Sequence, residues 1–437
     1  MHKRALLLAA TAAALLAITS ACTGGGSAPA EQDALSPTDP SKVTGEVTVL
    51  THRTDLVQDG TMKKYADEFK KTYPNVTIKY DAITDYEGEV KIRMNTENYG
   101  DVLMIPAAIQ RNDYPKFFAS LGGAADLSAK YRFTSNTTVN DKVYGLAGFG
   151  GVNGFIYNKE VWAAAGVTKW PTSSEEFLAA LAAIKAKGAS VPFYTNYKDG
   201  WPLSQLGGAL GAISCDPKAR DKLAAKESPW KAGSDLRAID TLLFNIVKNQ
   251  LIESDPATTN WEDSKGLLAT GKIATMGLGS WSIVQMQDAA KKAGKDPSII
   301  GYMPFPALPG GKPCAVLGPD YAYAVNIHSK VKPAARAFID FMTDKSGFAE
   351  SNQSVAVLKS APMPAALKPF SEAGVQLIEL TQEKAGEVDK IDKLSEIGAL
   401  STHDYRQKLV DIARGAAPGD LNGYLDELGK KWVAAVP

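Results

Sequence analysis

The chain has 437 residues, of which 45% are hydrophobic and 22% are charged, and its 48 basic side chains balance 48 acidic ones. This length exceeds what one hydrophobic core usually serves, so we expect two lobes. A formal charge of zero argues against a nucleic-acid surface and against a strongly acidic substrate.

Residues 1–21 have the three parts of a secretory signal peptide: a basic start, an apolar run over residues 5–18, and small residues before Cys22. The end of this stretch resembles the bacterial lipobox. That resemblance implies cleavage before Cys22, lipidation of the cysteine, and a protein anchored on the extracellular face of the cell membrane. Thr19 stands where the lipobox usually has Leu, so cleavage without lipidation is the alternative. No later run of about 18 apolar residues predicts a membrane span.

The stretch after the signal peptide and the remaining cysteines carry two further predictions. Residues 22–44 are rich in Gly, Ser, Pro and Ala, which predicts a flexible tether between membrane and domain. If Cys22 carries lipid, Cys215 and Cys314 remain as a pair in an oxidising compartment. A disulfide between them is the favoured interpretation, and two unpaired buried thiols are the alternative.

Strands and helices alternate in the first part of the body. Residues 46–50 and 76–82 predict strands on either side of a helix over 62–73, whose aromatic residues recur at spacing four. A helix over 86–98 and a buried strand over 101–105 follow. Strand–helix–strand at this spacing implies parallel pairing and an α/β class.

The middle of the chain contains a glycine-rich stretch over residues 142–158, whose five glycines and intervening apolar residues favour extended chain. A helix begins after Pro171, where Ser and Thr precede two glutamates, and continues to Gly188. The later predicted elements are a helix from 234 or 235, a strand over 272–278, a helix over 282–293, strands over 299–305 and 321–327, and a helix over 333–343.

Motifs for catalysis are absent from the sequence. His52, His328 and His403 form no metal-binding spacing, and neither a nucleophile elbow nor a phosphate-binding glycine motif occurs. We therefore expect no metal, no cofactor and no enzymatic activity. A pair of carboxylates for glycoside hydrolysis stays open, because any two of many acidic residues could converge in the fold.

Two tryptophans beside glycine or proline are the most informative side chains. Trp201 and Trp281 stand in loops, where a flat apolar ring suits stacking on the C–H face of a sugar. Asn196, Asp199 and Ser280 lie near them in sequence and are candidate partners for sugar hydroxyls. The alternative is that these tryptophans fill the core beneath the loops.

Charged residues beside strands are further candidates. Arg53 and Asp55 directly follow the first predicted strand, and Asp320 directly precedes the strand over 321–327. In α/β lobes the carboxyl ends of strands open on the ligand crevice, where such groups could bond a polyol. The alternative for Arg53 and Asp55 is a solvated surface ion pair.

Four segments together resemble the extracellular solute-binding proteins of ABC importers, in the class that includes the maltose-binding type. They are FIYNK at 155–159 with AAGV at 164–167, WPT at 170–172 with Phe177, GKIATM at 271–276 with GSW at 279–281, and MPFP at 303–306 with GG at 310–311 and 335–342. Their order and spacing cover nearly the whole chain after the signal peptide.

The resemblance implies a type II periplasmic-binding-protein fold, in which hinged α/β lobes enclose a ligand cleft. It implies crossings between the lobes near residues 147–153, 317–321 and 362–370. The lobes would comprise residues 45–150 with 320–365 and residues 151–319 with 366–437.

The resemblance also implies a function. Trp281 would stack on a sugar, the loop that includes Tyr197 would contact the ligand, and His403 stands where the maltose-binding type has a further ligand aromatic. We expect a monomer that captures a sugar or oligosaccharide and delivers it to an ABC permease. The alternatives are the same fold with a non-sugar solute (polyamine, glycerol phosphate, amino acid or peptide) and an extracellular carbohydrate-active enzyme.

Overall fold

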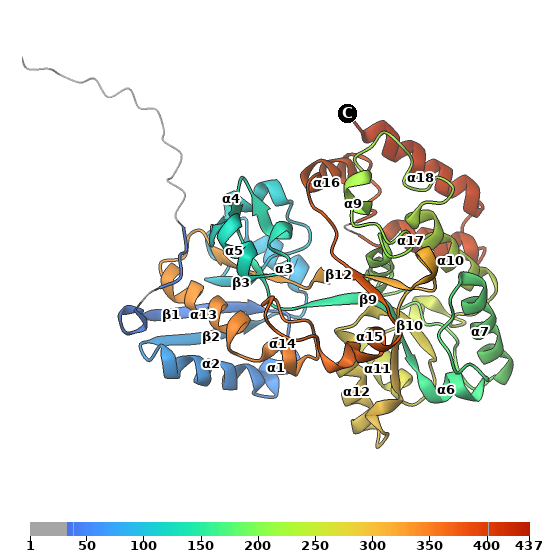
Figure 1. Ribbon diagram of the computed structural model, residues 1–437, viewed down its shortest axis with the longest axis horizontal. Coiled ribbons are helices and arrows are strands. Elements are labelled where there is room, and N and C mark those ends of the chain that lie inside the picture. The colour runs from blue at the N-terminus through green and yellow to red at the C-terminus, as the bar shows by residue number, and fades with distance from the viewer. Residues whose placement is uncertain (1–32, 38, 401) are drawn as a thin grey trace, which may run out of the picture.

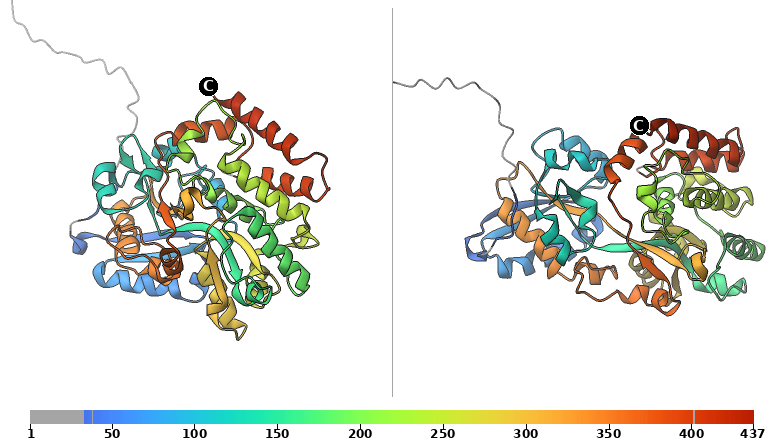
Figure 2. Two further views of the ribbon diagram at one scale, coloured as in Figure 1. Left: turned by 45° about the vertical axis from the view of Figure 1, so that its right-hand side comes forward. Right: turned by 45° about the horizontal axis from the view of Figure 1, so that its top comes forward.

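The computed structural model describes residues 33–37, 39–400 and 402–437. The predicted signal peptide and Cys22 lie outside these residues. The described chain forms two α/β lobes side by side, with strands β9 (Gly150–Asn158) and β12 (Cys314–Pro319) running between them (Figures 1 and 2). None of the helices in this part of the chain has the length and apolarity of a membrane span. The two-lobe α/β prediction is confirmed.

Lobe 1, which comprises the described residues up to 149 together with 320–359, is built on a six-stranded sheet. The strands of this sheet, in spatial order, are β2 (Val76–Ala82), β1 (Gly45–Thr51), β3 (Val102–Met104), β13 (Ala322–Asn326) and β4 (Phe118–Ala119), with β8 (Leu146–Ala147) beside β13. Strand β1 pairs in parallel with β2 and β3, as the strand–helix–strand spacing predicts. Strand β13 is antiparallel to β3, because the chain enters it from the other lobe through β12.

Helices cover this sheet and bury its apolar side chains. They are α1 (Thr54–Gln58), α2 (Thr61–Thr72), α3 (Tyr86–Arg93), α4 (Tyr114–Phe117), α5 (Ala124–Lys130), α13 (Lys332–Asp344) and α14 (Phe348–Ser351). Phe69 of α2 meets Phe338 of α13 edge-on at 5.6 Å between ring centroids, and both rings are buried. A small sheet adds β5 (Gly122–Gly123), β7 (Lys142–Val143) and β6 (Thr138–Val139).

Lobe 2, which comprises residues 150–319 and the chain from 370 onward, is built on a five-stranded sheet. The strands of this sheet are β10 (Thr275–Gly279), β9, β12 and β14 (Gln376–Ile378), with β11 (Ile300–Met303) also paired to β9. The helices are α6 (Lys159–Ala164), α7 (Ser174–Lys187), α8 (Trp201–Gln205), α9 (Ala219–Lys222), α10 (Asp235–Lys248), α11 (Trp261–Ala269), α12 (Ser282–Lys292), α15 (Lys368–Glu372), α16 (Ala385–Leu394), α17 (Asp404–Ala413) and α18 (Leu421–Ala435).

Local chemistry explains where α7 begins and ends. The Ser173 hydroxyl accepts a hydrogen bond of 3.2 Å from the Glu176 amide, and the Glu176 carboxylate accepts one of 2.7 Å from the Thr172 amide. Gly188 closes the helix with φ of 69°, a left-handed conformation that glycine adopts without steric cost. The predicted start and end of this helix are confirmed.

The core of lobe 2 contains a fully buried ion pair. Arg406 Nε donates to Asp240 Oδ1 at 2.9 Å, and both side chains are 0% exposed. Trp230 Nε1 donates to the other Asp240 oxygen at 2.7 Å, and the Arg406 guanidinium lies 4.8 Å from the Tyr405 ring centroid. Tyr405 therefore belongs to the core of this lobe.

A third crossing between the lobes follows α14. The Lys359 amide still donates to the Lys130 carbonyl in lobe 1, at 3.1 Å. Phe370 already stacks on Tyr302 in lobe 2, with ring centroids 5.7 Å apart. The chain therefore passes from lobe 1 to lobe 2 between residues 359 and 370.

The described part of the predicted tether packs against lobe 1. Ala34 is 1% exposed and Val43 is 5% exposed. Residues 40–42 form the short helix η1 (Pro40–Lys42), whose start is capped by the Asp39 side chain. The prediction of a flexible tether through residue 44 therefore does not hold for these residues, because the fold supplies partners that composition does not reveal.

Candidate functional site

A cavity of about 420 Å³ lies between the lobes, and β9 and β12 form its floor. The two strands are antiparallel, with Gly318 opposite Gly151 and Leu317 opposite Val152. Val152 and Leu317 are buried in the core and also border the cavity, as do Gly151 and Gly318 beside them. A side chain built at Gly318 would have no atom within 4 Å of its Cβ, so this floor lets a ligand approach the backbone.

Both lobes supply the walls of this cavity, which carry aromatic rings, neutral polar groups and three charged side chains. Lobe 1 contributes Phe133, Ser135, Asn136, Phe149 and Asp320, and lobe 2 contributes among others Asn153, Ser204, Gln205, Gly208, Arg220, Trp281, Glu379 and Gln382. A site made by two lobes is completed or opened when they move relative to one another.

Trp281 belongs to a cluster of three tryptophans in lobe 2. It lies two residues after the end of β10, and its ring centroid lies 5.9 Å from Trp201 and 5.6 Å from Trp261. Of the three, Trp281 is the ring that lines the cavity. Trp201 and Trp261 meet at 5.1 Å, and both rings contact Trp281. Both alternatives for the loop tryptophans are therefore represented: Trp281 faces the cleft and Trp201 supports it.

Ser280 and Asp199 act within the protein rather than at the cavity wall. Ser280 is buried, its hydroxyl accepts from the Val152 amide at 3.1 Å, and its own amide donates to the Val152 carbonyl at 2.8 Å. These bonds fix the position of Trp281 relative to the crossing strand β9. Asp199 Oδ2 accepts from the Trp261 amide at 2.6 Å, which holds the first turn of α11 beside the tryptophan cluster.

Asn196, Tyr197 and His403 do not line the cavity. Asn196 is fully buried and its Nδ2 contacts Met276 Sδ at 3.5 Å. The Tyr197 hydroxyl donates to the Asp411 carboxylate at 2.9 Å. His403 packs against the backbone of Gly200. Asn196 and Tyr197 lie in the loop before Trp201, whereas His403 directly precedes α17; all three side chains contact other parts of lobe 2 and none borders the cavity.

Arg53 and Asp55 form an ion pair on lobe 1. Arg53 donates to both Asp55 carboxylate oxygens, from Nε at 2.9 Å and from Nη2 at 2.7 Å, and a third bond of 3.1 Å reaches Asn352 from Nη1. The Arg53 side chain is 13% exposed and that of Asp55 is 57% exposed. The pair does not contribute to the cavity wall, although the charge of Arg53 acts to lower the pKa of Asp320.

Asp320 is the acidic side chain of lobe 1 that faces the cavity. One of its oxygens, Oδ1, accepts from the Tyr321 amide at 2.7 Å, and no other described residue bonds Oδ2. Burial raises the pKa of Asp320 above its usual range, although the Tyr321 amide and the Arg53 charge act in the opposite direction. A ligand hydroxyl could therefore donate to Oδ2, an acceptor that is partly buried.

Asn153 and Gln205 line the cavity with side-chain amides, and neither was among the site residues predicted from the sequence. Asn153 lies two residues beyond Gly151, on the same face of β9, and its side chain packs against Gly208 and Gly279. No described residue is hydrogen-bonded to either side-chain amide. The alternation of a strand could have indicated Asn153, since the crossing near 147–153 was already expected.

The structure joins Cys215 and Cys314 by a disulfide, across a sequence separation of 99 residues. Cys314 is the first residue of β12, and Cys215 follows Leu210 of the cavity wall by five positions. The bond therefore ties the wall of the cleft in lobe 2 to a crossing strand.

Comparison with known proteins identifies the family of this chain. A family model described as bacterial extracellular solute-binding protein matches residues 54–347, which is more than half of the 437 residues. This chain belongs to that family. Members of the family are binding proteins rather than enzymes, and within the described residues of this solute-binding protein no group of three His, Cys, Asp or Glu residues is placed to hold a metal.

Three relatives show how closely this solute-binding protein resembles known ones. A binding protein of an ABC transporter from Bifidobacterium animalis subsp. lactis, solved with mannobiose, is 30% identical, with a TM-score of 0.85 and coverage of 91% of this chain and 96% of that one. A manno-oligosaccharide-specific binding protein of the same organism, solved with mannotriose, is 29% identical, with a TM-score of 0.85 and coverage of 91% and 96%. The multiple sugar-binding protein of Streptococcus mutans is 25% identical over 313 residues, which are 68% of this chain and 71% of that protein.

Proposed function

We propose that this solute-binding protein captures a neutral sugar or short oligosaccharide outside the cytoplasm and delivers it to the permease of an ABC importer. The observation that carries the proposal is the cleft, whose lining includes the ring of Trp281, the amide of Asn153 and the carboxylate of Asp320. A sugar presents an apolar C–H face to an aromatic ring and hydroxyl groups to neutral polar side chains. The relatives solved with mannobiose and mannotriose support the same ligand class.

The charges of the cavity wall favour an uncharged ligand. Arg220 already pairs with Asp389 at 2.6 Å, and Glu379 accepts from Arg132 at 3.5 Å. A phosphate would require a cluster of uncompensated cations, and a polyamine would require several free acids. Among the described wall residues, Asp320 is the acid left without a basic partner in bonding contact. Ligands that are phosphate esters or polyamines therefore fit this cleft less well than a sugar.

Ligand-dependent stabilisation measures this proposal. A thermal-shift screen of the purified protein with mannobiose, mannotriose and other neutral oligosaccharides should raise the melting temperature for at least one of them. A ligand at 100 times its dissociation constant stabilises the folded state by about 2.7 kcal/mol. Calorimetry then gives the affinity, which we expect in the micromolar range, or about −8 kcal/mol. A shift with charged solutes alone would contradict the sugar proposal, and release of reducing sugar would identify an enzyme instead.

We further infer that the chain is a monomeric lipoprotein attached through Cys22. The sequence before Cys22 supports this, and a family whose members act outside the cell fits it. Attachment near the permease raises the local concentration of the loaded protein there. Mass spectrometry of the protein purified from membranes should find diacylglyceryl on Cys22, and Cys22→Ser should release the protein into the soluble fraction.

A further inference from the structure

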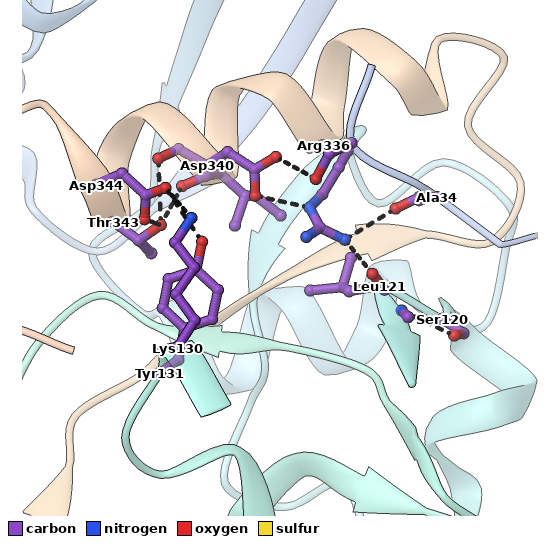
Figure 3. A network of polar contacts seen from close by, with 12 residues as sticks. Ala34, Ser120, Leu121, Lys130, Tyr131, Arg336, Asp340, Thr343 and Asp344 are labelled. Atoms are coloured by element: carbon purple, nitrogen blue, oxygen red, sulfur yellow. Dashed lines mark hydrogen bonds and ion pairs between the residues drawn. The ribbon is translucent and has the colours of Figure 1, made fainter. Parts of the chain in front are cut away.

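The arm, which we define as residues 33–37 and 39–44, binds to lobe 1 before the first strand begins. The Ala34 amide donates to the Ser120 carbonyl at 2.7 Å, and the Ala34 carbonyl accepts from Arg336 Nη1 at 3.1 Å. Figure 3 shows Ala34 on one side of the Arg336 guanidinium and Asp340 on the other. Ala34 is thus bonded through both of its backbone polar groups and is 1% exposed.

Arg336 is the centre of this attachment. Its side chain comes from α13, is 3% exposed, and donates from Nε to Asp340 Oδ1 at 2.8 Å. The same guanidinium also bonds the Leu121 carbonyl, next to Ser120 in the chain (Figure 3). Asp340 uses its second oxygen to accept from the Ser36 hydroxyl at 2.7 Å. Charge-assisted hydrogen bonds in a buried position are stronger than neutral hydrogen bonds at the surface. The bonds of Arg336 and Asp340 to the arm therefore stabilise its attachment to lobe 1.

Other contacts extend the attachment along the arm, and all of them involve lobe 1. Asp33 pairs with Lys142 at 3.0 Å. Asn75 donates to the Ser41 carbonyl at 3.2 Å, and Val43 is buried at 5% exposure. In Figure 1 the arm runs along the outer flank of lobe 1, away from lobe 2. Movement of lobe 2 about the crossing strands therefore leaves these contacts unchanged.

We propose that the arm is a clamp that fixes the anchored end of the chain to lobe 1, so that lobe 1 is the lobe held at the membrane and lobe 2 is the lobe that swings. The proposal rests on the lipid anchor of the proposed function. With the arm bound, the stretch from Cys22 to Asp33 reaches at most about 40 Å when fully extended. With the arm released, the stretch from Cys22 to Gly45 reaches about 80 Å. The clamp thus halves the reach of the anchor and moves its point of attachment to the outer flank of lobe 1.

Two substitutions at neighbouring positions distinguish the effect of releasing the arm from the effect of adding a negative charge to it. Ala34→Glu places a long charged side chain at a position that is 1% exposed and should release the arm. Leu35→Glu adds the same charge at a side chain that is 59% exposed and should leave the arm bound. Neither residue lines the cleft, so both variants should keep the wild-type affinity for mannotriose, the probe for folded cleft geometry.

Hydrogen exchange on the full chain tests the attachment without any membrane. The Ala34 amide should be protected in the wild type and in Leu35→Glu, and its protection should be lost in Ala34→Glu. Arg336→Leu should lose it too, since the arm then lacks its central partner. Equal exchange of this amide in the wild type and in Ala34→Glu would overturn the clamp.

Energy transfer to labelled lipids tests the consequence on vesicles that carry the lipidated protein. A dye on Ile92→Cys reports lobe 1, and a dye on Asp426→Cys reports lobe 2; both positions are exposed. In the wild type the lobe 1 dye should transfer more efficiently, and Ala34→Glu should reduce this difference, because the reach of the anchor doubles, while Leu35→Glu preserves it. Equal transfer from both dyes in the wild type would overturn the proposal. Protein that fails to float with the vesicles would instead refute the lipid anchor, while the exchange result would still stand.

Discussion

Gly318 offers a direct way to block the cleft without damaging the fold. It lies in the middle of β12, opposite Gly151, and lines the cavity of about 420 Å³. A Cβ at this position would have nothing within 4 Å, and the backbone there does not adopt a positive φ. The side chain in Gly318→Leu should therefore enter the cavity, on the same face of the strand as Asp320.

Stability and affinity should then change in opposite senses. Replacing a strand glycine removes a conformational cost of about 0.5–1 kcal/mol, so the unfolding free energy should stay constant or rise by that amount. The leucine would separate the ligand from groups such as Asp320 and Asn153. Losing two hydrogen bonds of about 1–1.5 kcal/mol each weakens binding by about 2–3 kcal/mol, or roughly 30- to 150-fold.

Calorimetry with mannotriose and thermal unfolding without ligand measure the two changes. Gly266→Leu is the matched control, because a Cβ at Gly266 also meets open space and this residue of α11 lies outside the cavity wall. The control should bind like the wild type. Unchanged affinity in Gly318→Leu would refute the assignment of this cavity as the ligand site, and a large loss of stability would refute the view that the space is open.

Three further predictions concern the aromatic wall, the core of lobe 2 and pH. Trp281→Ala should weaken sugar binding at least about 30-fold, because losing an aromatic anchor typically costs about 2 kcal/mol of binding free energy. Trp261→Ala should weaken binding less, because that ring does not line the cavity. Equal losses of affinity in calorimetry would contradict this prediction. Asp240→Ala strands Arg406 in the core without its counter-charge and should lower the unfolding free energy in urea by about 3–5 kcal/mol; a loss below about 1 kcal/mol would refute the role of the pair. Burial lowers the pKa of His52 from 6.5 to about 4, so the unfolded chain takes up its proton first as the pH falls, and stability that is complete above pH 6.5 declines toward pH 4. His52→Gln should flatten the measured dependence of unfolding free energy on pH over that range, and an unchanged slope would show that another group is responsible.

Much of the fold could be predicted because it depends on local signals. Strand β2 has the predicted bounds, and α7 begins and ends at the residues whose side chains and left-handed glycine cap it. The glycines over residues 142–158 predicted extended chain, and β9 occupies most of that stretch. Each of these elements is determined within a window of a few residues, where hydrogen bonding and steric freedom act directly.

The site was predictable only in part, because the sequence does not reveal where a loop directs its side chains. Trp281 and Asp320 were singled out and line the cavity, whereas Asn196, Tyr197 and His403 bond or pack within lobe 2. Asn196 has a φ of 53°, and this turn helps to carry its side chain into the interior. A residue pattern indicates that a loop is near the cleft, but the packing beneath the loop decides which residue faces it.

The sequence alone predicted the α/β class and offered Trp281 as one of two candidate ligand tryptophans, because these depend on composition, short periodicities and a few adjacent residues. The tertiary structure alone decided the fate of the arm. Its composition is that of a tether, yet Ala34 is held by Arg336, which lies 302 residues further along the chain. A contact between residues so far apart in the sequence forms only when lobe 1 is folded, so no local sequence pattern in the arm could have predicted it.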